Sequence, residues 1–285
     1  MTDATVREIR IETPYLCFAA RDWGPEEGHP LLALHGWLDN AASFEPLAPL
    51  LTGCRIVALD LTGHGLSDWR PPGVHYHFID YIPDVVAAAD ALGWERFSLL
   101  GHSLGAAVAS LVAGTVPKRV VRLALIEGLG PLTHRADENP VALVQAIAQM
   151  DRLHRKRLPL YHSFEEAVEA RSRAGLSRSA AEILVRRGTR TVGEQVGWRT
   201  DPRLTFRSPL YLVEEQVLAF LNRILAPTLL INAEDGYLAQ REHMIRRYRQ
   251  VENLHIRWLP GGHHLHLEDP QPCARLLGPF LRQDF

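Results

Sequence analysis

Cysteine, lysine and excess charge are all scarce in this 285-residue chain. The three cysteines, Cys17, Cys54 and Cys273, are odd in number and far apart, which argues against a disulfide framework or a cysteine-based zinc site. Buried free thiols are the simplest interpretation. Only Lys118 and Lys156 are lysines among 31 basic residues, and the net charge is −2. The chain therefore lacks the basic surplus typical of proteins that bind nucleic acid or anionic membranes.

A secretory signal and a membrane span are also not expected. Residues 1–12 alternate charged and apolar side chains and contain no apolar core of a signal peptide, so we expect a cytoplasmic protein. Residues 97–117 are uncharged and long enough to cross a bilayer. They nevertheless contain His102, Ser103 and several glycines, and they divide into a short β-rich run and an alanine-rich run. We interpret them as a strand followed by a helix.

Apolar runs and helical stretches alternate along most of the chain. An apolar fraction of 46% and a charged fraction of 22% are typical of a globular protein. The alternation predicts an α/β fold with a mostly parallel, eight-stranded sheet and helices on both faces. The expected strands are 6–12 and 15–22, which form a hairpin, and 30–34, 56–61, 97–100, 120–126, 228–232 and 255–259. The expected helices are 41–51, 79–92, 103–116, 212–224, 240–251 and 272–281.

The alternation is interrupted between residues 130 and 207, where helical periodicity occurs without a convincing strand. We predict helices at 141–153, 164–173 and 177–187, forming a helical cap (130–207) inserted into a core domain (1–129 and 208–285). The cap carries 14 basic and nine acidic residues, a net charge of +5, so the core carries −7. A basic cap could attract acidic substrates, or its charges could simply cover solvated helix faces.

The strongest chemical signal is Gly101-His102-Ser103-Leu104-Gly105, placed between a predicted strand and a predicted helix. This is the context of a nucleophile elbow, in which a sharp turn exposes the serine hydroxyl at the carboxyl edge of a sheet. Gly101 and Gly105 would allow the strand and helix to approach closely. The sequence therefore predicts Ser103 as a nucleophile; the alternative is a glycine-rich turn with a solvent-facing serine.

A serine nucleophile needs a general base, and a histidine-rich segment lies near the C-terminus. His263 follows Gly261-Gly262 just after the last predicted strand, which favours His263 as the base, with His264 as the alternative. A metal site formed by His263, His264 and His266 is disfavoured because no acidic or cysteine ligand cluster accompanies them. We therefore predict no metal and no other cofactor.

These motifs together resemble the α/β-hydrolase superfamily. His35-Gly36 after a strand, residues 60–67, the serine pentapeptide and the C-terminal Gly-Gly-His segment carry the resemblance. Residues 35–40, 126–131 and 198–204 resemble the serine hydrolase-like proteins within that superfamily. The resemblance implies that the backbone N–H groups of Trp37 and Leu104 form an oxyanion hole, with Gly36 permitting the tight loop; a core position for the Trp37 ring is the alternative.

The resemblance also implies an acid after one of two strands, and two residues compete. Glu127 directly follows the strand 120–126, where a charge has no other evident reason. Asp235 follows the strand 228–232, but the usual spacing puts Gly236 where the acid should stand. Both assignments stay open, with Glu127 preferred.

The residues thus predict a serine hydrolase, carboxylesterase-like, that cleaves an ester or thioester bond of a small-molecule substrate through an acyl-enzyme. A carbon–carbon bond hydrolase with the same triad and a non-catalytic ligand-binding protein of the same fold are the alternatives. We expect a monomer or a homodimer.

Overall fold

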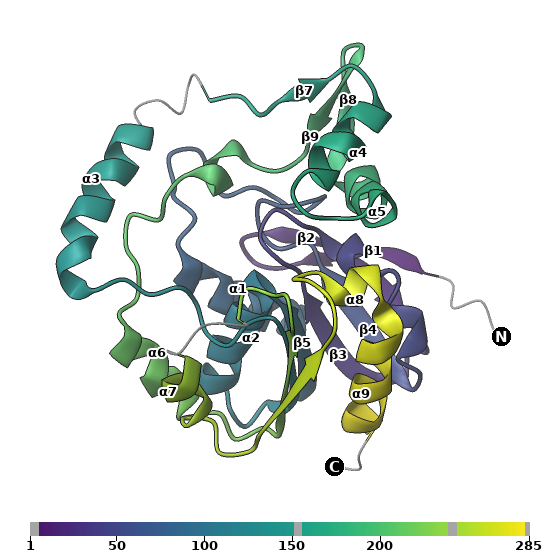
Figure 1. The fold of residues 1–285 in the computed structure, drawn as a ribbon, viewed down its shortest axis with the longest axis vertical. Helices are drawn as coiled ribbons and strands as arrows, with labels where there is room; N and C mark the ends of the chain where they lie inside the picture. Colours follow the sequence, from purple (N-terminus) through teal and green to yellow (C-terminus); the bar gives the residue numbers. More distant parts are fainter. Residues whose placement is uncertain (1–5, 151–155, 239–243, 283–285) are drawn as a thin grey trace.

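The computed structural model describes residues 6–150, 156–238 and 244–282. A twisted eight-stranded sheet runs through the protein in the order β1-β2-β4-β3-β5-β6-β10-β11 (Figure 1). The strands are β1 (Arg7–Glu12), β2 (Cys17–Trp23), β3 (His29–Leu34), β4 (Cys54–Leu59), β5 (Phe97–His102), β6 (Val120–Ile126), β10 (Thr228–Ala233) and β11 (Leu254–Leu259). β2 pairs antiparallel with β1 and with β4, and the other neighbours are parallel, which confirms the predicted sheet.

Helices cover both faces of the sheet because the buried strands are apolar on both sides. In β3, Leu32 and Leu34 join one core cluster, whereas Leu31 and Ala33 join the other. The first cluster includes α1 (Tyr81–Ala91), α2 (Leu104–Thr115), α6 (Glu214–Leu221) and α7 (Met244–Tyr248). The second includes α8 (Leu265–Glu268) and α9 (Pro270–Arg282). Cys17, Cys54 and Cys273 are buried free thiols.

The helix predicted at 41–51 is instead a pair of short 3-10 helices, η1 (Ala41–Phe44) and η2 (Ala48–Leu50), because Pro46 and Pro49 cannot donate the hydrogen bonds that a continuous helix requires. The uncharged stretch 97–117 divides into β5 and α2. Across the described residues, no helix has both the length and the apolarity needed to cross a bilayer.

The prediction that residues 130–207 contain no strand is wrong. A second, antiparallel sheet has the order β7-β9-β8, formed by β7 (Leu160–Tyr161), β8 (Thr189–Val192) and β9 (Gln195–Trp198). These strands are too short to show the alternation that reveals a half-buried strand in a sequence. The same segment holds η4 (Ala136–Glu138), α3 (Asn139–Met150), α4 (Phe164–Ser172), α5 (Arg178–Gly188) and η6 (Pro202–Thr205), and residues 151–153 of the first predicted helix lie outside the described residues.

Segment 130–207 is attached to the loops that follow β3 and β4. Figure 1 shows α4, α5 and the small sheet grouped at one end of the molecule, with α3 apart from them. Arg171 of α4 pairs with Asp39, and the buried Arg187 of α5 pairs with Asp60 and Glu8. Part of the basic charge of this segment thus neutralises acidic residues of the rest of the chain.

Candidate active site

Ser103 stands at the turn between β5 and α2, in a strained backbone conformation with φ 52° and ψ −110°. Gly101 and Gly105, two positions before and after Ser103, have no room for a side chain. A Cβ on Gly101 would lie 2.4 Å from the carbonyl oxygen of Gly105, and one on Gly105 would lie 1.9 Å from that of Leu34. The turn leaves Ser103 partly exposed above the carboxyl edge of the sheet, and its N–H donates to the Ile126 carbonyl at 3.0 Å.

Glu127 follows Ile126 directly and contacts the predicted base. Its Oε2 lies 3.1 Å from His263 Nδ1, and the carboxylate is fully buried. The same carboxylate accepts hydrogen bonds from the backbone N–H groups of Ala233 (2.7 Å) and Tyr237 (2.8 Å). A positive φ of 54° at Glu127 turns the chain at this point. The arrangement therefore orients the His263 ring through a carboxylate that is itself held by two backbone donors.

Asp235 is placed differently. Asp235 is exposed to solvent, and its backbone N–H donates to the Gly261 carbonyl at 3.0 Å. Among the described residues, its side chain makes no hydrogen bond to His263. Gly236 explains the unusual spacing, because a Cβ there would lie 2.2 Å from Glu127 Oε2. The space that a side chain at position 236 would fill is occupied by the Glu127 carboxylate.

The two predicted oxyanion donors lie at the start of α2 and in the loop after β3, the strand that pairs with β5. Leu104 is the first residue of α2, so its N–H has no acceptor within the helix. Trp37 lies in the loop after β3, next to Gly36, where a Cβ would come within 2.8 Å of Asp39 Oδ2 and force that buried side chain to shift. The Trp37 ring is 54% exposed and its Nε1–H donates to the Leu204 carbonyl at 3.1 Å, so the ring is not a core aromatic.

His35 holds the loop that carries Trp37. Its Nδ1–H donates to the Gly36 carbonyl at 2.8 Å, and its Nε2 accepts from the Leu61 N–H at 3.0 Å. Burial lowers the pKa of His35 to about 4, which keeps the ring neutral in this role. His35 thus joins the loops after β3 and β4.

The C-terminal histidines do not share one centre. His264 Nε2 lies 3.2 Å from Asp39 Oδ2, whereas the buried His266 contacts the Ser43 hydroxyl at 2.8 Å. Hydrogen bonds and ionic contacts lower the pKa of Asp39 against the opposing effect of burial, the largest of them from His264. Sequence reasoning assigned Asp39 no role, because its partner lies 225 positions away.

His102 lies beneath the site, next to Ser103. Its ring is fully buried, and its Nε2 lies 2.9 Å from the His263 carbonyl oxygen. Burial lowers the pKa of His102 well below its usual value, so the ring is neutral. Across the described residues, Asp39, His102 and His264 form the one group with ligand atoms close enough to hold a metal ion.

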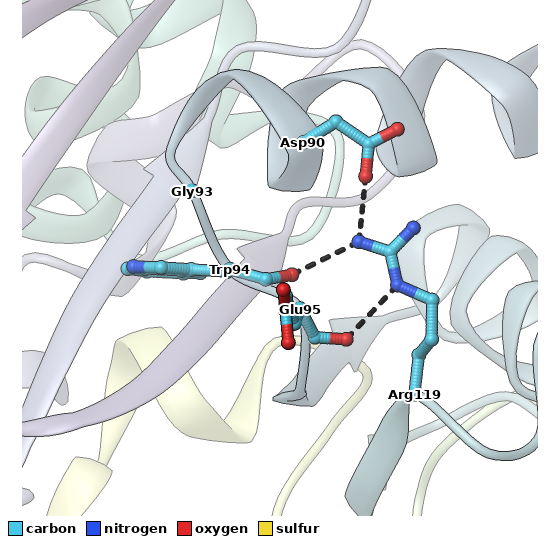
Figure 2. Close-up of a pocket in the computed structure, with 5 residues that line it drawn as sticks. All are labelled: Asp90, Gly93, Trp94, Glu95 and Arg119. Carbon is cyan, nitrogen blue, oxygen red and sulfur yellow. Dashed lines mark hydrogen bonds and ion pairs between the residues drawn. The ribbon is translucent and has the colours of Figure 1, made fainter.

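A surface pocket elsewhere does not belong to this site. Figure 2 shows its lining residues, Asp90, Gly93, Trp94, Glu95 and Arg119. They precede β5 and β6, whereas Ser103 and Glu127 follow those strands, so the pocket lies at the opposite edge of the sheet. The Arg119 guanidinium is occupied by Asp90 and by the carbonyl groups of Trp94 and Glu95, which indicates a structural role.

Similar proteins were found by sequence and by structure. The serine hydrolase-like protein of Danio rerio is 31% identical, over 96% of this chain and 88% of its own length. Serine hydrolase-like protein 2 of Homo sapiens is also 31% identical, over 97% and 94% respectively. The crystal structure of a hypothetical protein from Pseudomonas aeruginosa is 48% identical, covers 97% of this chain and 99% of its own, and superimposes with a TM-score of 0.93. A thioesterase domain from the curacin biosynthetic pathway is 26% identical, with coverages of 96% and 99% and a TM-score of 0.86.

The family assignment agrees with this architecture. The α/β hydrolase fold family matches residues 29–270, which include β3 through β11 and the whole candidate site. The chain therefore belongs to the α/β hydrolase fold family, in the group of serine hydrolase-like proteins.

Proposed function

We propose that this protein is a serine hydrolase that cleaves carboxylic ester or thioester bonds of small or medium organic substrates, with Ser103 as nucleophile, His263 as general base and Glu127 as the acid that positions His263. The observation that carries the proposal is the 3.1 Å contact between Glu127 and His263, made by a fully buried carboxylate beside a strained, accessible serine. The names of a serine hydrolase-like relative and a thioesterase neighbour support the same class.

The proposed reaction has two steps. His263 Nε2 accepts the Ser103 proton while Oγ attacks the substrate carbonyl, and Glu127 stabilises the imidazolium that forms. The backbone N–H groups of Leu104 and Trp37 donate to the developing oxyanion. His263 then returns the proton to the leaving group, and water releases the acyl group from Ser103 by the same route. In the free protein, the Ser103 hydroxyl and His263 make no hydrogen bond within the described ranges, and such contacts often tighten only when substrate binds.

A labelling experiment tests the nucleophile. A fluorophosphonate probe should form an adduct on Ser103, identified by mass spectrometry of peptides, and Ser103→Ala should remain unlabelled. Ser110 provides a matched control, because its hydroxyl is buried and donates to the Ala106 carbonyl at 2.7 Å. An intact, folded protein without an adduct on Ser103 refutes the proposal and favours a non-catalytic binding protein.

A substrate panel tests the bond that is cleaved. p-Nitrophenyl esters and acyl thioesters of increasing chain length should be turned over, each dependent on Ser103. Vinylogous diketones, included in the same panel, identify a carbon–carbon bond hydrolase. Turnover of the diketones alone would replace the ester assignment while leaving the triad in place.

A further inference from the structure

Three potential metal ligands meet directly behind the proposed triad. The ligand atoms of Asp39, His102 and His264 all lie within 4.8 Å of one another. Asp39 Oδ2 is 3.2 Å from His264 Nε2 and 3.8 Å from His102 Nδ1. Ligand atoms around a tetrahedral Zn²⁺ with bonds of about 2.0–2.1 Å stand roughly 3.3 Å apart, so movements of about 1 Å would complete such a geometry.

The hydrogen bonding of His102 leaves its Nδ1 without a partner. Nε2 lies 2.9 Å from the His263 carbonyl oxygen, which can only accept, so Nε2 carries the proton. Nδ1 of this neutral ring therefore presents a lone pair, and it is a buried nitrogen with no hydrogen-bond partner in the described structure. This lone pair faces the Asp39 carboxylate, which is also an acceptor. Asp39 also interacts with His264 and Arg171, so His102 Nδ1 is the unsatisfied atom of the group, and a cation bound between it and Asp39 Oδ2 would give it a partner.

Of the three candidate ligands, His264 is the one that reaches solvent. A Cβ on Gly36 would lie 2.8 Å from Asp39 Oδ2 and 2.9 Å from His102 Nδ1, so Gly36 packs directly against both ligand atoms and any larger residue there would displace them. The His264 side chain is 16% exposed and provides access from solvent. Asp39 and His102 are almost completely buried.

We propose that Asp39, His102 and His264 form a binding site for a divalent transition metal ion, with Zn²⁺ as the representative. Two imidazole nitrogens and one carboxylate favour Zn²⁺, Co²⁺, Ni²⁺ or Cu²⁺ over the oxygen-preferring Mg²⁺ and Ca²⁺. The surrounding contacts fit this role, since a histidine ligand usually donates its second N–H to a carbonyl, as His102 does, and a ligating carboxylate is itself hydrogen-bonded, as Asp39 is by Arg171. The positive charge of Arg171 weakens the site, so we expect reversible binding.

Metal binding here should inhibit the enzyme, a consequence that rests on the proposed function. His264 follows the proposed base His263, and the His263 and His264 rings have centroids 5.2 Å apart. A dication on His264 opposes formation of the His263 imidazolium during proton transfer from Ser103. Saturating Zn²⁺ should therefore lower kcat by roughly tenfold or more.

Titration calorimetry with Zn²⁺ tests the site without any need for turnover. The wild-type protein should bind one Zn²⁺, and Co²⁺ should develop visible absorption bands of a low-symmetry site, whereas Mg²⁺ should bind neither detectably nor competitively. His264→Gln should weaken Zn²⁺ binding by roughly 10–100-fold or more. His255→Gln, the same substitution at an exposed histidine of β11, should leave Zn²⁺ binding unchanged.

Two further variants separate this site from the rest of the protein. Asp39→Asn should weaken Zn²⁺ binding as His264→Gln does, and thermal unfolding shows whether it still folds. Ser103→Ala should bind Zn²⁺ with wild-type affinity. The binding result can therefore be interpreted even if the proposed catalytic function proves wrong. Absence of Zn²⁺ binding by the wild type, or wild-type affinity in folded His264→Gln, overturns the proposal. Loss of binding in His263→Gln with retention in His264→Gln would place the metal on the catalytic base instead.

Discussion

Replacing Glu127 by glutamine removes the charge that the proposed mechanism needs while keeping the shape of the side chain. In the structure, Oε1 accepts from the Ala233 N–H, and Oε2 accepts from both the Tyr237 N–H and His263. The amide of Gln has one oxygen and one NH₂ group. Whichever way it turns, the NH₂ group meets a backbone N–H, and the favoured orientation keeps the oxygen on Tyr237 and His263.

This geometry predicts two separate effects of Glu127→Gln, a loss of stability and a loss of kcat. One buried backbone donor, at Ala233, loses its acceptor, which costs about 1–3 kcal/mol of unfolding free energy. For a chain of this size, that corresponds to a decrease in Tm of roughly 2–10 °C. Loss of imidazolium stabilisation at His263 should lower kcat by roughly 10²–10⁴-fold, since an amide in place of a triad carboxylate supplies no charge.

The assay compares kcat and KM for a p-nitrophenyl ester, together with the rate of fluorophosphonate labelling of Ser103, at temperatures well below each Tm. A purely structural role of Glu127 would lower the amount of folded enzyme but leave kcat per folded molecule and its pH profile unchanged. Asp235→Asn is the matched control at the competing carboxylate and should stay within about twofold of the wild type, because surface substitutions rarely have large effects. Full activity of Glu127→Gln combined with loss of activity in Asp235→Asn would refute the assignment.

Three other outcomes are expected from the packing and charge of the core. Gly105→Ala should destabilise the fold by about 3 kcal/mol or more in urea unfolding, since its Cβ would lie 1.9 Å from the Leu34 carbonyl oxygen; a stability equal to that of the wild type would contradict the elbow geometry. Arg187→Met should cost about 3–5 kcal/mol by leaving the buried Asp60 without its ion pair, whereas Arg186→Met, which breaks only an exposed pair with Glu182, should cost less than about 1 kcal/mol; equal losses would show that burial is irrelevant here. Burial lowers the pKa of His35 to about 4 and of His64 to about 3, below the usual 6.5. As the pH falls, these histidines are therefore protonated in the unfolded chain at a higher pH than in the folded protein. Stability should therefore fall as the pH drops from 6.5 towards 4, by up to ~3 kcal/mol for each histidine, and a urea midpoint that is unchanged between pH 7 and pH 5 would contradict this.

Much of the framework could be predicted from local sequence. The hairpin of β1 and β2, the alternation of strands with helices and the turn at Ser103 depend on nearby residues, because strand propensity, proline and glycine act over a few positions. Gly101 is required by contacts within the same turn, whereas Gly105 is required by the Leu34 carbonyl oxygen of the neighbouring strand β3, a contact that the local sequence does not show. The small sheet of β7, β8 and β9 was missed because strands of two to four residues carry no readable period.

The choice between Glu127 and Asp235 illustrates what remained open. Both residues follow neighbouring parallel strands, β6 and β10, so both reach the same edge of the sheet. The sequence did contain a hint, since Gly236 stands where an acid is usual. Its meaning depends on the Glu127 carboxylate lying 2.2 Å from the place where a side chain at 236 would begin.

The sequence by itself therefore determined the sheet, the elbow and the presence of a serine, a histidine and two possible acids, because these follow from patterns within single elements. Only the tertiary structure decided which carboxylate meets His263, and it alone brought Asp39 to His264 across 225 positions. The physical reason is that side-chain contacts between separate loops depend on strand order and loop direction. Hydrogen bonds to buried carboxylates then favour one set of side-chain contacts, and these hydrogen bonds cannot be predicted from residue spacing along the chain.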